Sequence, residues 1–560
     1  MTVIRHLTVP PSAGVLGPAP GTVESAEQYA AVGGYAGTTT PDALLDHLDA
    51  SGLRGRGGAG FPASVKLGAV RDRGRAGGGT TPVVVANGEE GEPGSVKDRW
   101  LLRTRPHLVL DGLARAAAVT GAGRGYVYLS DPEAAARVRG ALAERPPALP
   151  VTVVETGHAY VAGEESAVVR RIDGGPALPR AKPPRPFEQG VGGAPTLVSN
   201  VETLARIALT AARPDLRLDI ARSTLVTLSG GPGAPLLTEV PYGTPLRDLA
   251  DAVGVPDPAG ALMGGLFGGL VDAGALGLPL EPDALAAAGT ALGCGAVRFL
   301  AGGGCPVSAA ADAAGYLAAE SSRQCGVCVS GTAAIYGALA GLAAGTAAPD
   351  TAAHLERWST GLRGRGACAL LDAAASLAGS LLRAFPTAVA SHLTTRCEPC
   401  TAATAQPTSH LTVPVPPVTD RRSAAGPSGR PPSAAAPADA DQRALAIRAN
   451  AGPSSPAPLA APANTSPSSP APLTTPANTG PFGPAPLTTP AKTGRPGPAS
   501  EAGRPFGSPD PAVTEGRAPG REASPSAGGG SRNSPAGPGA RGAAPPVAAK
   551  AVVAGRAGDG

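Results

Sequence analysis

The glycine-rich stretch RGRGGAGFP, residues 54–62, lies between two segments with helical periodicity, PDALLDHLDASGL (41–53) and ASVKLGAVRDR (63–73). A glycine loop that opens a helix is a common phosphate cradle, because bare backbone N–H groups approach the anion and the helix dipole favours its charge. Lys66 lies one turn inside that helix, within reach of a phosphate. A plain flexible turn is the alternative, since the loop lacks the spaced G-x-G-x-x-G of a dinucleotide fold.

Two later segments place polar side chains directly after a predicted strand. PVVVA (82–86) leads to Asn87, Glu89, Glu90 and Glu92, and VTVVE (151–155) leads to Tyr160, Gly163, Glu164 and Glu165. Open α/β sheets bind ligands where their strands end, so we expect these groups to hydrogen-bond a polyhydroxylated cofactor. General acid–base catalysis could use the same carboxylates, and clustered carboxylates also occur on solvated surfaces.

These motifs continue in a fixed order. RGRGGAGFP is followed by NGEEGEPGSVKDR (87–99), YVAGEE (160–165), PRAKPPRP (179–186) and SNVETLA (199–205). The ordered set resembles the flavin-bearing subunit of respiratory complex I (NADH:quinone oxidoreductase) and its relatives in NAD-reducing hydrogenases and NAD-dependent formate dehydrogenases. The resemblance covers roughly residues 40–390. It implies an FMN-dependent oxidoreductase that takes hydride from NADH, its substrate, and passes single electrons to a [4Fe-4S] cluster.

The resemblance also implies a fold of the α/β plus α class. The expected parts are an N-terminal extension (1–39), a Rossmann-like FMN- and NADH-binding domain (40–215), a small ubiquitin-like β-grasp domain of the SLBB type (220–290), a helical iron–sulfur-binding bundle (295–395) and a tail (401–560). The sequence agrees with this order, because residues 223–254 predict strand, turn, strand and helix, and the Ala-rich residues 312–388 predict helices.

Site residues follow from the resemblance, position by position. FMN is expected to contact Gly55, Arg56, Gly57, Gly58, Lys66, Asn87, Glu89, Tyr160, Gly163, Glu164, Lys182, Asn200 and Thr203. Glu90, Glu92 and Glu165 are expected nearer the nicotinamide, as the catalytic residues. Two positions depart from the family: Glu89 replaces an Asp, and Ser199 replaces the first Asn of a pair.

The adenine pocket departs further. The family stacks the adenine of NADH between phenylalanines, and of these only Phe61 is kept, while Ala69 and Arg185 occupy the other two positions. An arginine stacks on a purine face, but an alanine removes a partner worth on the order of 1 kcal/mol. The sequence therefore favours FMN binding over NADH binding.

The stretch ESSRQCGVCVSG (320–331) aligns with the family's cluster motif E-S-C-G-Q-C-x-x-C. Cys325, Cys328 and, farther along, Cys368 match three of its four cysteines, and Ser322 stands in the place of the remaining one. A serine alkoxide is a harder donor than a thiolate, so the fourth iron would be weakly held or take an outside ligand. Ordinary buried cysteines in an Ala-rich bundle are the alternative.

The remaining cysteines leave two interpretations open. Cys294 and Cys305 lie in glycine-rich turns and are interpreted as structural. Cys397 and Cys400 form a second C-x-x-C, with His392 five residues upstream. Zinc usually takes four ligands and the sequence shows three together, so a zinc site and a plain pair of thiols both remain open.

Composition changes sharply at residue 401. Pro, Ala, Gly, Ser and Thr dominate from there on, and a 14-residue repeat runs through 454–495, which predicts a disordered, extended spacer. The tail holds 14 Lys/Arg and 8 Asp/Glu of the chain's 47 and 43, so residues 1–400 carry 33 and 35. The basic excess therefore lies in the tail, and no nucleic-acid partner is expected.

Location and partners follow from the same inventory. The N-terminus lacks the apolar stretch of a signal peptide, and no window suggests the ~20 apolar residues of a membrane span, so a cytoplasmic protein is expected. The expected partner is an iron–sulfur protein such as a 2Fe-2S subunit or a ferredoxin. A second hypothesis is a degenerate or partner-dependent subunit that keeps the fold and FMN but exchanges electrons with a ferredoxin-like partner, or acts as a scaffold, without using NADH.

Overall fold

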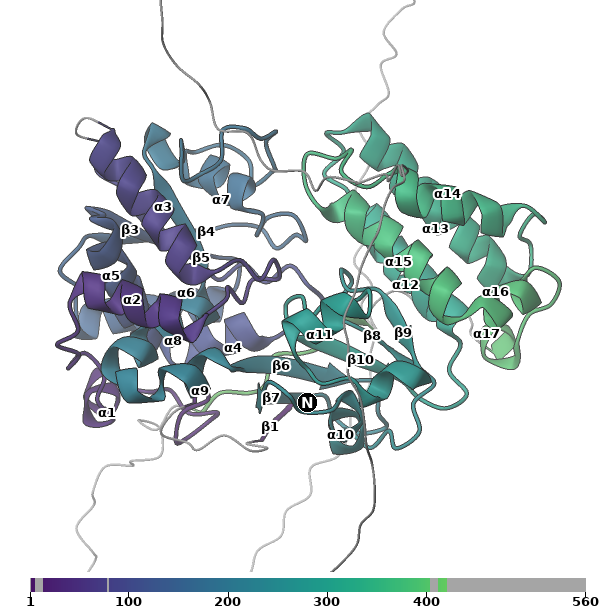
Figure 1. Cartoon of the computed structure of the whole chain (residues 1–560), viewed down its shortest axis with the longest axis horizontal. Coiled ribbons are helices and arrows are strands. Elements are labelled where there is room, and N and C mark those ends of the chain that lie inside the picture. Colours follow the sequence, from purple (N-terminus) through teal and green to yellow (C-terminus); the bar gives the residue numbers. More distant parts are fainter. Residues whose placement is uncertain (1, 6–13, 78–79, 403–410, 420–560) are drawn as a thin grey trace, which may run out of the picture. The chain divides into compact units, whose positions relative to one another are not determined.

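The computed structural model describes residues 2–5, 14–77, 80–402 and 411–419 (Figure 1). The predicted spacer repeat and most of the predicted tail lie outside these residues. The described elements form a parallel sheet with helices, a second sheet, and a group of helices.

The first sheet is parallel throughout, in the order β4-β3-β2-β5. Its strands are β2 (Val83–Asn87), β3 (Arg124–Leu129), β4 (Val151–Glu155) and β5 (Thr196–Asn200). Val83 to Ala86 in the central strand β2 are fully buried, as in parallel sheets that are covered on both faces. The two strands predicted from the sequence, at 82–86 and 151–155, are confirmed as β2 and β4.

Helices cover both faces of this sheet. Val84 and Ala86 pack into a core shared with α2 (Pro41–Ser51), α3 (Ala63–Ala76), α4 (Lys97–Thr104), α5 (Pro106–Thr120), α6 (Pro132–Glu144) and α8 (Val201–Ala212). Val83 and Val85 face α7 (Glu165–Ile172) and η1 (Val191–Gly193) on the other side. Short segments complete this part: α1 (Ala26–Ala31), η2 (Pro214–Leu216) and α9 (Arg217–Ala221). The expected α/β class is confirmed.

The second sheet has the order β1-β7-β6-β10-β8-β9. Its strands are β1 (Val3–Ile4), β6 (Ser223–Ser229), β7 (Leu236–Pro241), β8 (Gly260–Leu262), β9 (Leu270–Asp272) and β10 (Ala296–Leu300). The β6–β7 hairpin and α10 (Leu246–Ala252) confirm the predicted strand, turn, strand and helix. β10 runs parallel to β6 in the middle of the sheet, and η3 (Ala273–Gly277) and α11 (Pro282–Ala287) pack with α10 on its core.

The last described helices form one group, and all but the last of them pack around one apolar core (Figure 1, green). They are α12 (Pro306–Ala319), α13 (Gly326–Ala344), α14 (Thr351–Gly361), α15 (Leu370–Ala384), α16 (Pro386–His392) and α17 (Glu398–Ala402). By length and apolar composition alone, α13 would be long enough to cross a membrane, so the expectation that no window approaches a span is wrong for this helix. Its Ile335, Leu339 and Leu342 are nevertheless buried in the core of the helical group.

Residues 411–419 correct the expectation that disorder begins at residue 401. Leu411 and Val413 are 5% and 2% exposed, and the Val413 N–H donates to the Pro93 carbonyl over 2.9 Å. At the other end of this segment, the Thr419 N–H donates to the Gly21 carbonyl over 2.8 Å. Its prolines keep the segment extended, and backbone hydrogen bonds together with the buried side chains of Leu411 and Val413 hold it against the rest of the fold.

Candidate functional site

The glycine loop lies where α2 ends and α3 begins. Gly58 and Gly60 have φ of 108° and 61°, a backbone conformation that side-chain-bearing residues rarely adopt. A Cβ on Gly57 would come within 3.2 Å of the Asn200 Cβ, so the loop lies directly against the end of β5. The Arg56 N–H donates to Thr203 Oγ1 over 2.8 Å, which attaches the loop to α8.

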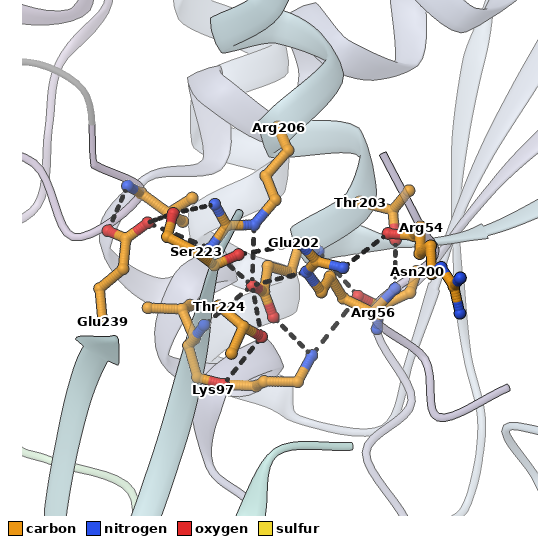
Figure 2. Close-up of polar contacts among 12 residues, drawn as sticks. Arg54, Arg56, Lys97, Asn200, Glu202, Thr203, Arg206, Ser223, Thr224 and Glu239 are labelled. Carbon is orange, nitrogen blue, oxygen red and sulfur yellow. Dashed lines mark hydrogen bonds and ion pairs between the residues drawn. The ribbon is translucent and has the colours of Figure 1, made fainter. Parts of the chain in front are cut away.

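A buried ionic network includes Arg56 of this loop (Figure 2). Glu202 on α8 is fully buried and lies within 4 Å of Lys97 (3.1 Å), Arg206 (2.9 Å) and Arg56 (3.8 Å). Burial alone would raise the pKa of Glu202, but these three cations together lower it to about 2. Arg206 also reaches Glu239 on β7 over 3.1 Å, so the network ties α8 to the second sheet.

Arg56 takes part in this network with its side chain rather than facing a ligand. Its guanidinium donates to the carbonyl oxygens of Ala221 (2.6 Å) and Ser223 (2.9 Å), and the whole residue is 4% exposed. The Arg56 side chain is therefore committed to this network, and only its backbone, whose N–H donates to Thr203, forms part of the glycine loop. Lys97, Glu202 and Arg206 were not expected as site residues, because in the sequence they are ordinary charges on amphipathic helices.

The loop after β2 carries an unusual carboxylate. The Glu89 side chain is fully buried, and its Oε1 lies 3.2 Å from Nδ1 of His158, whose pKa this hydrogen bond raises. Among the described residues, Glu89 Oε2 has no hydrogen-bond partner. Asn87 donates from Nδ2 to the Gly163 carbonyl over 2.8 Å, and a Cβ on Gly163 would lie 2.9 Å from the Glu89 carbonyl oxygen. Residues 87–89 and 160–163 thus form one tight cradle.

The next two glutamates have different surroundings. Glu90 accepts from the Asp98 and Arg99 N–H groups over 3.1 and 3.2 Å and from the Ser95 hydroxyl, so it holds the first turn of α4. Glu92 accepts from the Leu266 N–H over 3.0 Å, at the edge of the second sheet. Burial raises the pKa of Glu92 to about 8, although hydrogen bonds from Leu266 and Tyr160 oppose the shift. Glu92 is therefore largely protonated at neutral pH.

Two lysines and two glutamates meet near the start of α7. Lys182 Nζ contacts both Glu164 Oε1 and Glu165 Oε1, the latter over 3.3 Å, and Lys66 Nζ lies 3.6 Å from Glu165 Oε2. Glu164 also caps α7, because it accepts from the Ser166 and Ala167 N–H groups. Burial lowers the pKa of the Lys66 ammonium. The structure brings Lys66, in the first turn of α3, together with Glu164 and Glu165 at the start of α7.

Of the three residues of the expected adenine pocket, two are exposed to solvent and one is partly buried. Phe61 is 53% exposed, just before α3, and Ala69 lies two turns farther along this helix and is partly buried. Arg185 is exposed, and its N–H donates to Glu188 Oε2 over 2.7 Å.

The cysteine motif at 320–328 adjoins these cofactor loops. The Tyr160 N–H donates to Glu320 Oε2 over 2.8 Å, and Gln324 Nε2 donates to the Pro179 carbonyl over 2.9 Å. Cys328 lies in the apolar core of the helical group, with Cys325 and Cys368 partly buried against the same core, and burial raises the pKa of Cys328 and Cys368. Ser321 Oγ lies 3.8 Å from Cys328 Sγ. Two residues farther along, Arg323 has a φ of 56°, which is uncommon for a residue other than glycine.

Comparisons with known proteins give the same picture. Residues 48–209 match the family model of the Nuo51 FMN-binding domain, and residues 308–392 match the NADH-ubiquinone oxidoreductase-F iron-sulfur binding region. The second NADH-quinone oxidoreductase F subunit of Rhizobium meliloti is 32% identical over 401 residues, which are 67% of this chain and 94% of that protein. The chain belongs to the F-subunit family of NADH-quinone oxidoreductases.

Another member of the F-subunit family and a solved structure agree. The F subunit of the Streptomyces coelicolor NADH-quinone oxidoreductase is 31% identical over 381 residues, covering 64% of this chain and 84% of the relative. The crystal structure of an NAD+-reducing [NiFe]-hydrogenase in the H2-reduced state matches with a TM-score of 0.58 and 27% identity, over 71% of this chain and 69% of the hydrogenase chain. The resemblance stated from the motifs is confirmed.

The residues present fit the FMN of the F-subunit family. The unpartnered Glu89 Oε2 is a buried acceptor without a donor, which a ribityl hydroxyl would supply. A Cβ on Gly57 or Gly163 would press against Asn200 or Glu89, so the two glycines let the loops around Glu89 pack closely. Three thiols, Cys325, Cys328 and Cys368, belong to the same apolar core and are soft donors that fit an iron–sulfur cluster, with Ser322 at the sequence position of the fourth.

Proposed function

We propose that this F-subunit homologue is an FMN-dependent NADH dehydrogenase-like oxidoreductase that delivers single electrons to a [4Fe-4S] cluster. FMN, when bound, accepts a hydride from NADH and releases its two electrons one at a time. The observation that carries the proposal is the buried cradle around Glu89, which the Tyr160–Glu320 hydrogen bond joins to the cysteine motif.

The cradle suggests how the chain would hold the cofactor. Glu89 would accept a hydrogen bond from the ribityl chain, and Lys66 would leave Glu165 to neutralise the phosphate, helped by bare N–H groups of the loop. Asn87 and Thr203 hold the two loops in place. The proposed FMN contacts are Gly55, Gly57, Gly58, Lys66, Asn87, Glu89, Tyr160, Gly163, Glu164, Lys182, Asn200, Thr203 and the backbone of Arg56.

The remaining glutamates would act on the nicotinamide side. We assign Glu92 and Glu165 there, with Glu92 entering as a neutral acid because its pKa is about 8. Glu90 would act as a positioning residue, since its carboxylate is taken up by the first turn of α4. NADH would lay its adenine on Phe61, with Arg185 as a second contact and no ring at Ala69.

Cluster binding is proposed for Cys325, Cys328 and Cys368, with Ser322 at the fourth position. The second sheet would correspond to the SLBB-type β-grasp domain, and the helices from α12 on to the iron–sulfur bundle. A further iron–sulfur protein is the proposed electron acceptor, because the relatives are named as subunits of NADH-quinone oxidoreductase. The predicted spacer role of the tail stays a proposal.

An anaerobic absorption titration tests the function. Purified wild-type chain should show flavin bands that bleach on addition of NADH, above a broad iron–sulfur shoulder. Glu89→Ala should lose FMN, because it removes the buried acceptor, whereas Glu155→Ala, at an exposed glutamate on β4, should retain it. A colourless protein that reconstitutes no flavin would contradict the proposal.

One observation favours a second candidate. The expected adenine pocket keeps a single phenylalanine, and this side chain is half exposed. A flavoprotein that has given up NADH and exchanges electrons with a ferredoxin-like partner would show bands that persist with NADH and bleach with dithionite. The same titration therefore separates the two candidates.

A further inference from the structure

Four metal-ligating side chains converge at one end of the helical group, apart from the cysteine motif at 320–328. They are Cys305, His392, Cys397 and Cys400, and their ligand atoms all lie within 4.8 Å of one another. Cys305 caps the start of α12, His392 ends α16, and Cys397 and Cys400 lie just before and within α17. His392 and Cys400 are each 3% exposed.

The distances suit a single ion. Cys305 Sγ lies 3.4 Å from His392 Nε2 and 3.5 Å from Cys400 Sγ, and Cys400 Sγ lies 3.6 Å from His392 Nε2. A tetrahedral zinc ion, with Zn–S near 2.3 Å and Zn–N near 2.0 Å, separates its ligand atoms by roughly 3.4–3.8 Å. A disulfide would need its sulfurs at about 2.05 Å. An iron–sulfur cube would hold its ligands farther apart than this cluster does.

The surroundings prepare the histidine and a thiolate as ligands. His392 Nδ1 lies 2.7 Å from the Ala388 carbonyl oxygen, so Nδ1–H donates there and the Nε2 lone pair faces the cysteines. The Ser308 N–H donates to Cys305 Sγ over 3.5 Å, which stabilises negative charge on the sulfur. Three thiolates and one divalent ion together carry one net negative charge. Arg396, which donates to the Cys400 carbonyl, places a cation near that charge.

We propose that Cys305, His392, Cys397 and Cys400 bind one structural zinc ion, distinct from the iron-binding cysteines. Three thiolates and an imidazole are a common set of four ligands for structural zinc, and the spacing H-x4-C-x2-C of His392, Cys397 and Cys400 is typical of such sites. Cys305 completes the set from 87 residues before His392, so the ion closes a long loop across the helical group.

Zinc also accounts for the order of the last helices. α17 has five residues, too few for a helix to be stable alone, and Cys400 is its one buried residue. α16 buries Val389 and His392. The metal ligands therefore make up much of the inward face of both helices, and zinc would fix that face to the start of α12.

Metal analysis of the purified full-length chain tests this site independently of flavin or NADH. We expect one zinc ion per chain in addition to iron. Cys397→Ser should lower zinc affinity by more than about tenfold and leave the iron content unchanged. Cys325→Ser is the reciprocal control, which should lose iron and keep zinc. Zinc content that is unchanged in Cys397→Ser would overturn the proposal. So would a wild-type chain that contains no zinc and loses iron when Cys397 is replaced by Ser, because the four residues would then bind iron.

A second measurement uses the unmutated protein, in case a variant does not fold. X-ray absorption at the zinc edge should show three sulfurs near 2.3 Å and one nitrogen near 2.0 Å. A shell of nitrogen and oxygen alone would mean surface-bound zinc and would overturn the site. Preparations from zinc-supplemented and zinc-chelated cultures should differ in zinc content but not in flavin content, which separates this site from the proposed redox function.

Discussion

Ser321 and Ser322 precede the cysteines of the proposed iron site. Ser321 Oγ lies 3.8 Å from Cys328 Sγ, whereas Ser322 occupies the position of the family's cysteine. We expect Ser322→Cys to raise iron content and the lifetime of the cluster in air, because a thiolate holds iron better than an alkoxide. Iron analysis and visible absorption measure both. Ser321→Cys is the matched control, and an equal gain there would assign the fourth position to Ser321 instead.

Ala69 is the position at which the proposed adenine pocket lacks a ring. A ring at this position would restore a stacking partner beside Phe61, worth about 1 kcal/mol. We expect Ala69→Phe to lower the dissociation constant of NADH about fivefold, measured by anaerobic calorimetry. Arg75→Phe, which adds the same ring near the far end of α3, should leave the affinity unchanged. Equal effects of both variants would mean that the gain is nonspecific.

Glu92 should make stability depend on pH. Burial raises its pKa from the ordinary glutamate value to about 8, so the unfolded chain releases this proton more readily than the folded chain. Stability from this group is therefore complete below about pH 4.5 and falls as pH rises to about 8. Glu92→Gln mimics the protonated form and should be more stable than wild type by roughly 2–4 kcal/mol at pH 9, and similar to it at pH 5. Denaturant unfolding at both pH values checks this, and parallel pH profiles would contradict it.

At the scale of elements, one carboxylate holds α8 to the glycine loop. Glu202 is fully buried among three cations, of which Arg206 also pairs with Glu239 and Lys97 with Asp98, so Glu202→Gln leaves an excess of buried positive charge and should lower the free energy of unfolding by roughly 3–5 kcal/mol. FMN affinity should fall as well, because the loop loses its support. Glu281→Gln removes an exposed partner of Arg222 and should cost less than about 1 kcal/mol. Chemical unfolding of both variants decides whether the network is structural.

The elements themselves were largely predictable from the sequence, and their polar interior was not. The apolar run at 82–86, the strand at 151–155 and the hairpin after residue 223 follow from local periodicity and turn residues. The direction of the Arg56 side chain does not, because it depends on carbonyl groups at Ala221 and Ser223, brought close only by the tertiary fold. The role of Glu90 was not predictable either, because it accepts from the Asp98 N–H only where the loop after β2 folds back onto the start of α4.

At the scale of the whole molecule, individual contacts between distant parts of the sequence could not be predicted from the sequence. Nothing near Cys305 indicates that it would meet His392 and Cys400, so the sequence showed three of four possible zinc ligands. The family motifs did indicate that the cysteine motif and the cofactor loops belong together, yet the Tyr160–Glu320 hydrogen bond that joins them is visible only in the fold.

Residues 411–419 are the other long-range contact, and a pair of truncations measures their role. Leu411 and Val413 are buried, and the Val413 hydrogen bond to Pro93 adjoins Glu92 in the proposed site. Burial of each such side chain is worth roughly 1.5–3 kcal/mol. A chain ending at residue 410 should therefore unfold at a melting temperature several degrees lower than wild type.

A chain ending at residue 419 is the matched control, because it keeps the segment and removes only the residues expected to bury nothing. We expect its melting temperature and flavin content to equal those of wild type. Since Cys400 precedes both ends, zinc should remain in both truncated chains, so a loss of stability in the shorter one reports on the segment and not on the metal. Equal melting temperatures of the two truncations would mean that residues 411–419 contribute nothing to stability.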